Sequence, residues 1–541
     1  MSIATPLGEF RNHPPTDFSR PAQREAFLQG LVQARALFPV EVPLLINGKQ
    51  LEGTEKLESQ DPAEFSRVIA RTAAAGEEHV NRAVKAARAA FGPWARRPAE
   101  ERAEVLLRAA RLMAERKYLL AGVIVHEAGK PWREADADVD EAIDFLNFYA
   151  REMARLANPR RMQNYLLGEH NDLSYHALGV VGVIGPWNFP LAIPVGMASA
   201  ALVAGNTVIL KPAEQTPLIA WLWVRIMEEA GLPPGVLNFT PGRGEVCGAR
   251  LVSHPDVNMI VFTGSREVGL HIVREAAVTH PGQNFVKRVV TEMGGKNALI
   301  VDSSADLDSS VPDVIYSAFG FAGQKCSACS RLILVQDVYD EYLERLKEGV
   351  DSLKIGLPEK PATQVGPVID ADAAAKVRSY IELGNQSARR IHVADIGDLA
   401  RTGHFVPPSI FAVESPTHRL AQEEIFGPVL TVLKARDFEE ALDIANSTPY
   451  ALTGGVHSRT PSNLRKAREE FHAGNLYLNR TITGAIVGRQ PFGGYRLSGI
   501  GSKAGGPDYL RQFLVARVVS ENMMRHGMAS LVEAPAQTYE D

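Results

Sequence analysis

Short apolar runs alternate with longer helical stretches after residue 178. Four such runs are rich in β-branched residues: Val180–Gly185, Thr207–Lys211, Val236–Thr240 and Met259–Thr263. This rhythm is typical of buried parallel strands joined by crossover helices. It predicts a doubly wound α/β sheet.

A second series of the same kind follows: Ala298–Val301, Leu332–Val335, Val429–Leu433 and Leu476–Asn479. It predicts a second doubly wound α/β domain, so the expected fold class is α/β with two such domains. Residues 78–156 have helical periodicity, and their apolar stripe is assigned to core packing.

Two segments outside the sheets, one at the N-terminus and one in the first half of the chain, differ from this pattern. Residues 1–40 are predicted to form a helical arm, with Phe27, Leu28, Leu31 and Leu37 on roughly one side. Residues 163–178 alternate between polar and apolar around turn residues, which indicates a projecting hairpin.

The C-terminal region is expected to end in a strand and a tail. Residues 513–519 form an apolar run that predicts a lone strand with no obvious local partner. Residues 526–541 are expected to be a loose tail.

Composition narrows the class of protein. A chain of 541 residues is too long for one core, so two or three domains are expected. The net charge of −5 gives no electrostatic case for nucleic acid or an anionic membrane surface. Three cysteines favour a reducing compartment, and no apolar run reaches the roughly 18 residues of a membrane span. We expect a cytoplasmic protein with no nucleic-acid or membrane partner.

Three segments carry candidate chemistry. Cys326 follows a glycine-rich approach that ends in Lys325, and a neighbouring lysine favours the nucleophilic thiolate. Glu292 precedes a Gly-Gly turn, so its carboxylate is a candidate base at a strand edge. Asn188 lies in a proline-stiffened loop and offers an amide donor for an oxyanion. Together these are the parts that acyl chemistry needs.

A phosphate site is predicted where the strand Met259–Thr263 leads into a helix. Gly264 and Ser265 stand at that helix start, with Val268 one turn on, and a helix N-terminus with a small residue and a hydroxyl suits a pyrophosphate. The glycines of residues 242–248 do not match the usual dinucleotide fingerprint, because the third one falls one place late.

Ordered motifs along the chain resemble the aldehyde dehydrogenase superfamily, from about residue 45 to about residue 525. Besides the Cys326 segment they are Lys-Pro-Ala-Glu at 211–214, Phe-Thr-Gly-Ser at 262–265, Glu-Glu-Ile-Phe-Gly-Pro at 423–428 and Pro-Phe-Gly-Gly at 491–494. The segments at 323–331 and 483–494 are similar to the branch that oxidises L-glutamate γ-semialdehyde, the open form of 1-pyrroline-5-carboxylate.

The resemblance implies a division of the chain and an assembly. Residues 41–158 and 179–294 would form the NAD-binding domain and residues 295–507 the catalytic domain. Residues 159–178 and 508–525 would form a small β flap through which the family oligomerises, so a homo-oligomer is expected.

The resemblance also implies roles for single residues. Cys326 would form a thiohemiacetal and then a thioester, Asn188 would hold the oxyanion, and Glu292 would activate water. NAD is the expected cofactor and NADP a weaker one, and no metal is expected. The implied cofactor contacts are Ile184, Pro186, Trp187, Lys211, Glu214, Gly264, Ser265, Val268, Glu424 and Phe426.

The implied reaction is the second step of proline breakdown, which suggests a functional link to proline dehydrogenase. Ser327, Gly484 and Ala485 would hold the substrate carboxylate, and Phe492 would pack on its aliphatic part. Another acid semialdehyde such as succinate semialdehyde is the alternative, which Arg489 keeps open.

Two hypotheses of a different class remain. Cys326 and Cys329 form a Cys-x-x-Cys pair, which suggests a redox role or a disulfide that silences Cys326 under oxidant. The second hypothesis is a non-catalytic binding protein with the same fold. A protein that had lost its enzymatic activity would, however, be expected to lose some of the candidate catalytic and cofactor residues.

Overall fold

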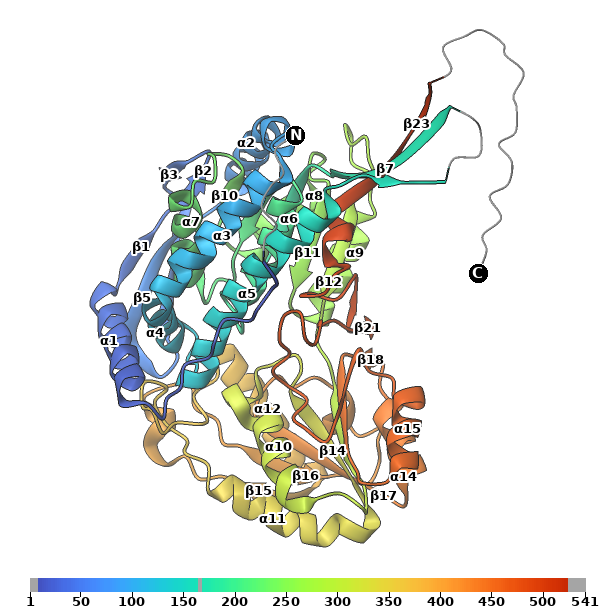
Figure 1. Cartoon of the computed structure of the whole chain (residues 1–541). Helices are drawn as coiled ribbons and strands as arrows, with labels where there is room; N and C mark the ends of the chain where they lie inside the picture. Colours follow the sequence, from blue (N-terminus) through green and yellow to red (C-terminus); the bar gives the residue numbers. More distant parts are fainter. Residues whose placement is uncertain (1–7, 164–167, 524–541) are drawn as a thin grey trace.

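The computed structural model describes residues 8–163 and 168–523. It has two α/β domains, one above the other in Figure 1, and a β ribbon that projects from the upper one. The predicted two-domain α/β fold class is confirmed. The exact domain boundaries stay a prediction, and the predicted tail at 526–541 lies outside the described residues.

The first sheet has eight strands, of which the central five are parallel. In spatial order they are β22 (Gly499–Ile500), β12 (Arg288–Glu292), β11 (Met259–Thr263), β8 (Val180–Ile184), β9 (Thr207–Lys211), β10 (Leu237–Phe239), β2 (Leu44–Ile46) and β3 (Lys49–Leu51). The sequence therefore located the parallel strands of residues 180–263 to within about a residue or two at each end.

Both faces of this sheet are buried, which explains the continuous apolar runs. On β8, Val181 and Val183 pack into one hydrophobic core, while Val180 and Ile184 pack into another on the opposite face. The surrounding helices are α2 (Glu77–Ala95), α3 (Ala99–Glu115), α4 (Lys117–Glu127), α5 (Trp132–Leu156), α6 (Ala192–Val203), α7 (Pro217–Glu229), α8 (Ala249–Ser253) and α9 (Arg266–Ala276).

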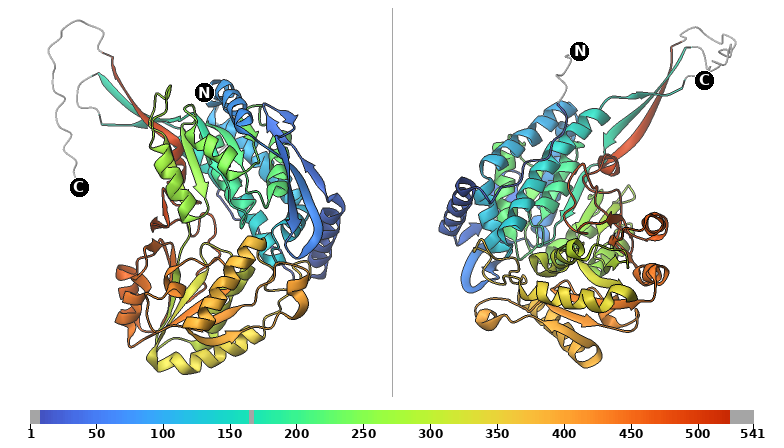
Figure 2. Two further views of the ribbon diagram at one scale, coloured as in Figure 1. Left: turned by 180° about the vertical axis from the view of Figure 1, so that it is seen from behind. Right: turned by 60° about the horizontal axis from the view of Figure 1, so that its bottom comes forward.

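The second sheet has seven strands and its own core. In spatial order they are β15 (Arg389–Val393), β16 (Ser409–Ala412), β17 (Val429–Ala435), β14 (Cys329–Val335), β13 (Asn297–Val301), β19 (Thr453–His457) and β20 (Asn475–Leu478). Its helices are α10 (Leu307–Phe319), α11 (Tyr339–Asp351), α12 (Ala371–Ser387), α13 (Arg419–Gln422), α14 (Phe438–Asn446) and α15 (Pro461–Glu470). Figure 2 shows from behind how this domain faces the first.

The projecting ribbon corrects one prediction. Strand β23 (Leu514–Asn522) pairs antiparallel with β7 (Glu169–Ala177) over their whole length, and β6 (Arg160–Arg161) joins β7 on its other edge. Strand β23 is therefore not a lone strand, although it has no partner near it in sequence, as predicted. Its partner is about 340 residues away in sequence, which a local pattern cannot reveal.

The N-terminal arm is helical only in its second half. Helix α1 (Pro21–Leu37) buries Phe27 and Leu31, but Leu28 and Leu37 are exposed, so the predicted single apolar side is only half right. Residues 8–20 are extended and run along α5 (Figure 1).

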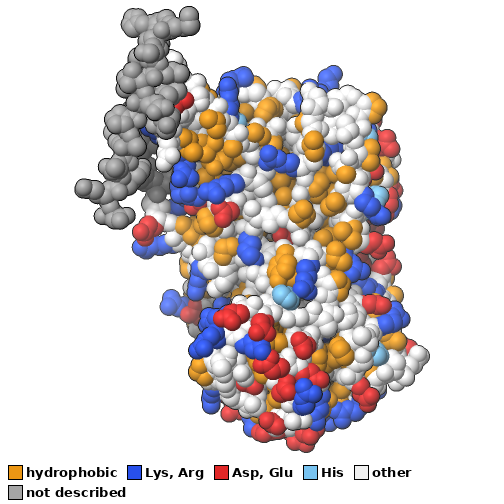
Figure 3. Space-filling model, turned by 90° about the vertical axis from the view of Figure 1, so that its right-hand side faces the viewer, with side chains coloured by type: hydrophobic (Ala, Val, Ile, Leu, Met, Phe, Trp, Pro, Cys, Tyr) orange, Lys and Arg blue, Asp and Glu red, His pale blue; other side chains and the backbone are white. Residues whose placement is uncertain are grey.

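The surface carries both signs of charge. On the face drawn in Figure 3, basic and acidic side chains are mixed, and acidic ones gather over the lower domain. No helix in the described residues is long and apolar enough to cross a membrane.

Candidate active site

A cavity of about 980 Å³ opens where β8, β9 and β11 end and the second domain approaches. The carboxyl ends of parallel strands are where ligands bind in doubly wound sheets. Both Cys326 and Asn188 line the cavity. So do all the predicted cofactor contacts, namely Ile184, Pro186, Trp187, Lys211, Glu214, Gly264, Ser265, Val268, Glu424 and Phe426.

The start of α9 forms one wall of the cavity. Strand β11 ends at Thr263, and the Ser265 hydroxyl caps the helix by accepting the Val268 N–H at 3.3 Å. Gly264 has no room for a side chain, since a Cβ there would lie 2.5 Å from the Phe262 ring. The helix dipole and first-turn amides suit an anion such as a pyrophosphate.

Lys211 and Glu214 stand at the end of β9. Lys211 Nζ is buried and donates to Glu214 Oε1 at 3.5 Å, and the same oxygen accepts the Gly244 N–H at 2.8 Å. A cation and a carboxylate with a free oxygen can bind the hydroxyls of a ribose. Together with the helix start, these residues fit a dinucleotide.

The opposite end of the cavity is aromatic and close to Glu424. The Trp187 and Phe426 rings meet edge to face, with centroids 5.4 Å apart. Glu424 Oε1 accepts the Gly295 N–H at 3.0 Å, and a Cβ on Gly294 would collide with this carboxylate. The Gly-Gly turn after Glu292 is therefore explained by the close approach of Glu424.

Backbone ties hold Cys326 in place. The preceding turn has left-handed residues at Phe321 and Ala322, with φ of 53° and 52°. Asn297 Nδ2 donates to the carbonyl oxygens of Cys326 at 2.7 Å and Ala328 at 2.9 Å. We did not predict this role for Asn297, although a polar residue that opens a buried strand was an available signal.

The expected activation of Cys326 by Lys325 is wrong. The Lys325 ammonium is buried elsewhere, 2.7 Å from Glu134 Oε1 and over the Tyr316 ring. Burial raises the pKa of the Cys326 thiol to about 12, and the charges of Glu292 and Glu424 add to the rise. In this state the sulfur is therefore a thiol at neutral pH, and its nucleophilic form requires a base.

Asn188 approaches the same turn from the loop between β8 and α6. Its side chain is buried, and Nδ2 donates to the Gln324 carbonyl oxygen at 3.0 Å. This bond holds the backbone carbonyl of Gln324, which is two residues before Cys326 in sequence. The predicted oxyanion donor and the predicted nucleophile thus come together.

Glu292 is the last residue of β12 and lies outside the cavity lining. Its Oε2 accepts the Gly494 N–H at 3.3 Å, while Oε1 is buried and has no hydrogen-bond partner among the described residues. Burial raises the pKa of Glu292 to about 8, and the Lys503 charge acts in the opposite direction. Such a carboxyl can exchange a proton near neutral pH.

Lys503 is a neighbour that the sequence did not reveal. Its ammonium donates to the carbonyl oxygens of Gly474 at 2.7 Å and Gly493 at 2.6 Å. It thereby holds the turn whose next amide meets Glu292. No local motif identifies it, because its partners lie in other segments of the chain.

The predicted substrate residues lie outside the cofactor cavity. The Ser327 carbonyl oxygen accepts the Thr453 hydroxyl at 3.1 Å. Gly484 has a φ of 75° and open space where a Cβ would stand. Phe492 forms a bridge with Ala504, and Ala485 follows Gly484 in the same loop. Their contact with substrate stays a prediction.

The second cysteine of the Cys-x-x-Cys pair packs inside a hydrophobic core. Cys329 is buried in the core of the second domain, and its thiol lies 3.5 Å from the Arg331 carbonyl oxygen. Both Cys326 and Cys329 are free thiols. In the described residues, no group of three or more His, Cys, Asp or Glu could hold a metal ion.

Comparison with known proteins decides the family. The aldehyde dehydrogenase family matches residues 50–519. The chain belongs to the aldehyde dehydrogenase family. It is 51% identical to 1-pyrroline-5-carboxylate dehydrogenase of Geobacillus kaustophilus over 95% of this chain and 99% of the relative.

Solved structures agree with this placement. The 1-pyrroline-5-carboxylate dehydrogenase from Thermus with bound NAD superposes with a TM-score of 0.93 at 46% identity, covering 96% of this chain and 100% of that one. Proline utilization A from Bdellovibrio bacteriovorus gives a TM-score of 0.95 at 46% identity, over 97% of this chain. This chain spans 55% of that longer protein.

Proposed function

We propose that the chain is an NAD-dependent dehydrogenase that oxidises L-glutamate γ-semialdehyde to L-glutamate in proline catabolism. The observation that carries the proposal is that Cys326 lines the same cavity as every predicted cofactor contact. The similarity to 1-pyrroline-5-carboxylate dehydrogenases over nearly the whole chain supports the choice of substrate.

The first step is attack of Cys326 Sγ on the aldehyde carbon. A carbon–sulfur bond forms, and the carbonyl oxygen becomes an oxyanion that the Asn188 amide and the Cys326 N–H stabilise as donors. One such donor typically contributes about 3 kcal/mol. The thiol proton passes to solvent water as the carbon–sulfur bond forms, so Glu292 stays free to act as a base in the next stage.

The second stage is hydrolysis. When bound, NAD supplies the acceptor for the hydride whose loss turns the cysteine adduct into a thioester. Glu292 then takes a proton from a water molecule whose oxygen attacks the thioester carbon, the carbon–sulfur bond breaks, and that proton passes to the leaving sulfur. The carboxylic acid leaves, and Cys326 is restored.

Cofactor selection is assigned to Lys211 and Glu214. A carboxylate at this position accepts hydrogen bonds from a free ribose 2′-hydroxyl and repels a 2′-phosphate. NAD is therefore the preferred cofactor, and Lys211 leaves room for weaker use of NADP.

Substrate selection is assigned to the loop after β20. The Ser327 hydroxyl and the amides near Gly484 and Ala485 would hold the substrate carboxylate as a nest of donors. Phe492 would cover the aliphatic chain. Arg489 is the residue that would anchor succinate semialdehyde, the alternative substrate. Its side chain is exposed.

A direct assay tests this function. NADH formation is measured with L-glutamate γ-semialdehyde and with succinate semialdehyde, and kcat/KM is compared. We expect at least about a tenfold preference for the former, because its extra polar groups need partners that the site provides. A preference for succinate semialdehyde would replace the proposed substrate.

Assembly and context complete the proposal. The β6–β7–β23 ribbon projects from the body and exposes Val518 and Val519, so we assign it to contact between copies in a homo-oligomer. The likeness to proline utilization A supports a functional link to proline dehydrogenase. The three free cysteines favour the cytoplasm.

A further inference from the structure

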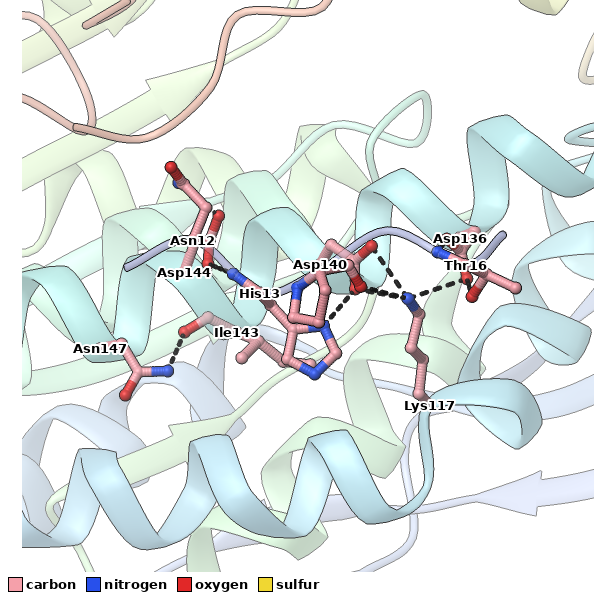
Figure 4. A network of polar contacts seen from close by, with 10 residues as sticks. Asn12, His13, Thr16, Lys117, Asp136, Asp140, Ile143, Asp144 and Asn147 are labelled. Carbon is pink, nitrogen blue, oxygen red and sulfur yellow. Dashed lines mark hydrogen bonds and ion pairs between the residues drawn. The ribbon is translucent and has the colours of Figure 1, made fainter. Parts of the chain in front are cut away.

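The extended segment of residues 8–20 is bound along one face of α5. Asp136, Asp140 and Asp144 follow one another at intervals of four on this helix, so their carboxylates form a ridge on one side. All three are buried under the segment. Figure 4 shows the ridge and the residues that meet it.

The ridge is bound mainly by groups that tie the segment to α5. Thr16 donates to Asp136 through its hydroxyl at 2.6 Å and its N–H at 2.9 Å. His13 Nδ1 lies 2.7 Å from Asp140 Oδ1. Lys117 of α4 neutralises part of the charge, at 3.0 Å from Asp136 and 2.7 Å from Asp140. These contacts explain why the segment lies where it does.

One residue connects the ridge to a different part of the molecule. Asn12 Nδ2 donates to Asp144 Oδ2 at 2.8 Å and to the Val487 carbonyl oxygen at 2.9 Å. The second bond joins positions 475 residues apart. The other Asp144 oxygen accepts the His13 N–H at 2.6 Å, so the carboxylate is fixed from both sides.

A ring contact strengthens the same connection. Gly488 has a φ of 75°, and a Cβ on it would lie 2.9 Å from the Phe10 ring. The Phe10 ring in turn packs edge to face on Phe148 of α5, with centroids 5.1 Å apart. Two consecutive residues of the loop, Val487 and Gly488, are thus held from one side by the segment of residues 8–20.

The loop they belong to also has bonds of its own: the Arg489 and Gln490 N–H groups donate to the Ile486 carbonyl oxygen, and the Ile486 N–H donates to Gln490 Oε1 at 3.1 Å. The Gly488 N–H donates to the Gly505 carbonyl oxygen at 2.9 Å on the other side. Two glycines with positive φ, Gly484 and Gly488, allow the backbone many conformations when it is not held. These internal bonds close only the turn 486–490, so the contacts with Phe10, Asn12 and Gly505 determine how that turn lies against α5.

We propose that Asn12 is a positioning residue that sets the shape of the substrate loop 483–490 by tying the Val487 carbonyl to α5. The inference rests on the proposed function, because Gly484 and Ala485 of this loop are the assigned carboxylate donors. Fixing a binding loop in advance removes the entropy cost of ordering it when substrate binds. Asn12 thereby raises affinity for the carboxylate-bearing aldehyde without touching it.

The test compares the full-length chain with Asn12→Ala and Thr16→Val. Thr16 also holds the segment to α5, but its hydroxyl donates to Asp136 and not to the loop. KM and kcat are measured with L-glutamate γ-semialdehyde and with pentanal, a similar aldehyde without the α-carboxylate and α-ammonium groups. Hydrogen exchange of the peptide that spans 483–490 is followed in the same proteins.

We expect Asn12→Ala to raise KM for the semialdehyde about tenfold, since it removes two hydrogen bonds, and to leave kcat within about twofold. KM for pentanal and for NAD should not change, and exchange of 483–490 should be faster. Thr16→Val should match the unaltered chain in each of these measurements.

Three results would overturn the inference: an unchanged exchange rate in Asn12→Ala, an unchanged semialdehyde KM despite faster exchange, or an equal rise of KM in Thr16→Val or with pentanal. If Asn12→Ala does not fold, Phe10→Leu decides in its place, since it weakens the contact with Gly488 from the same segment. Failure of the proposed function is distinguished by the unaltered chain, which would then not oxidise the semialdehyde at all.

Discussion

The two sides of Cys326 differ in how far apart in sequence the residues that form them lie. Most predicted cofactor contacts lie at the ends of β8, β9 and β11 and at the start of α9, within a few residues of a strand end, whereas Glu424 and Phe426 come from the second domain. The proposed substrate side is a glycine-containing loop, in which Val487 is bonded to Asn12 and Gly488 to Gly505. Local geometry fixes most of the first side, whereas the second is held by partners that are distant in sequence.

This difference assigns separate roles to changes on the two sides. A substitution at a strand end should alter cofactor use and leave the aldehyde untouched, because the sheet keeps its shape. A substitution that loosens the loop should do the reverse. Changes at the residue between them should stop the reaction without affecting either binding event.

Removing the nucleophile gives the largest expected effect. In Cys326→Ala no carbon–sulfur bond can form, so NADH production with the semialdehyde should fall by at least about 10³-fold. Affinity for NAD should stay within about twofold, measured by quenching of tryptophan fluorescence, to which Trp187 in the cavity contributes. The matched control is Cys329→Ala, whose sulfur is buried in the second core and should be dispensable for turnover. Residual turnover in Cys326→Ala would refute the mechanism.

Replacing the base gives the next largest effect. Glu292→Gln cannot take a proton from water, so hydrolysis of the thioester should slow by about 10²–10⁴-fold. NADH should then appear as a burst, followed by a slow steady state, in stopped-flow absorbance. Equal rates in both phases would show that another group is the base.

The pH profile tests the same residue. Because burial raises the pKa of Glu292 to about 8, the basic form is lost as pH falls through that value and gained above it. Wild-type hydrolysis should therefore rise with pH through about 8, and the Gln variant should lack this rise. Since the Lys503 charge lowers the pKa of Glu292, Lys503→Met should move the rise to higher pH.

Much of the fold and of the cofactor side could be predicted from local sequence. The apolar runs at Thr207–Lys211 and Met259–Thr263 coincide with β9 and β11, because strands buried on both faces must be apolar throughout. Motif residues placed at these strand ends then line one cavity. Near each strand, sequence neighbours are also neighbours in space.

The remaining errors have a common physical cause. Lys325 was expected beside the thiol, but its direction is set by Glu134 on α5, almost 200 positions earlier. The strand β23 is predicted to be a lone strand with no local partner, and its partner β7 lies equally out of local reach. Asn12 gave no signal, since an asparagine in an extended segment is ordinary. Each error concerns a contact that only the tertiary fold creates.

The smallest expected effect tests whether the two sides are separable. In Glu214→Gln the carboxylate charge is lost, so KM for NAD should rise about fivefold and the preference for NAD over NADP should fall about tenfold. Glu245→Gln is the matched control, because Glu245 lines the same cavity and is exposed, with no assigned cofactor contact. Both values follow from kcat/KM with each dinucleotide at saturating semialdehyde.

The semialdehyde KM should stay constant in both variants, since β9 ends far from the 483–490 loop in sequence and shares no hydrogen bond with it among the described residues. A rise of the semialdehyde KM in Glu214→Gln alone would mean that the cofactor side transmits its state across Cys326, and the division between a locally fixed side and a distantly held one would have to be abandoned.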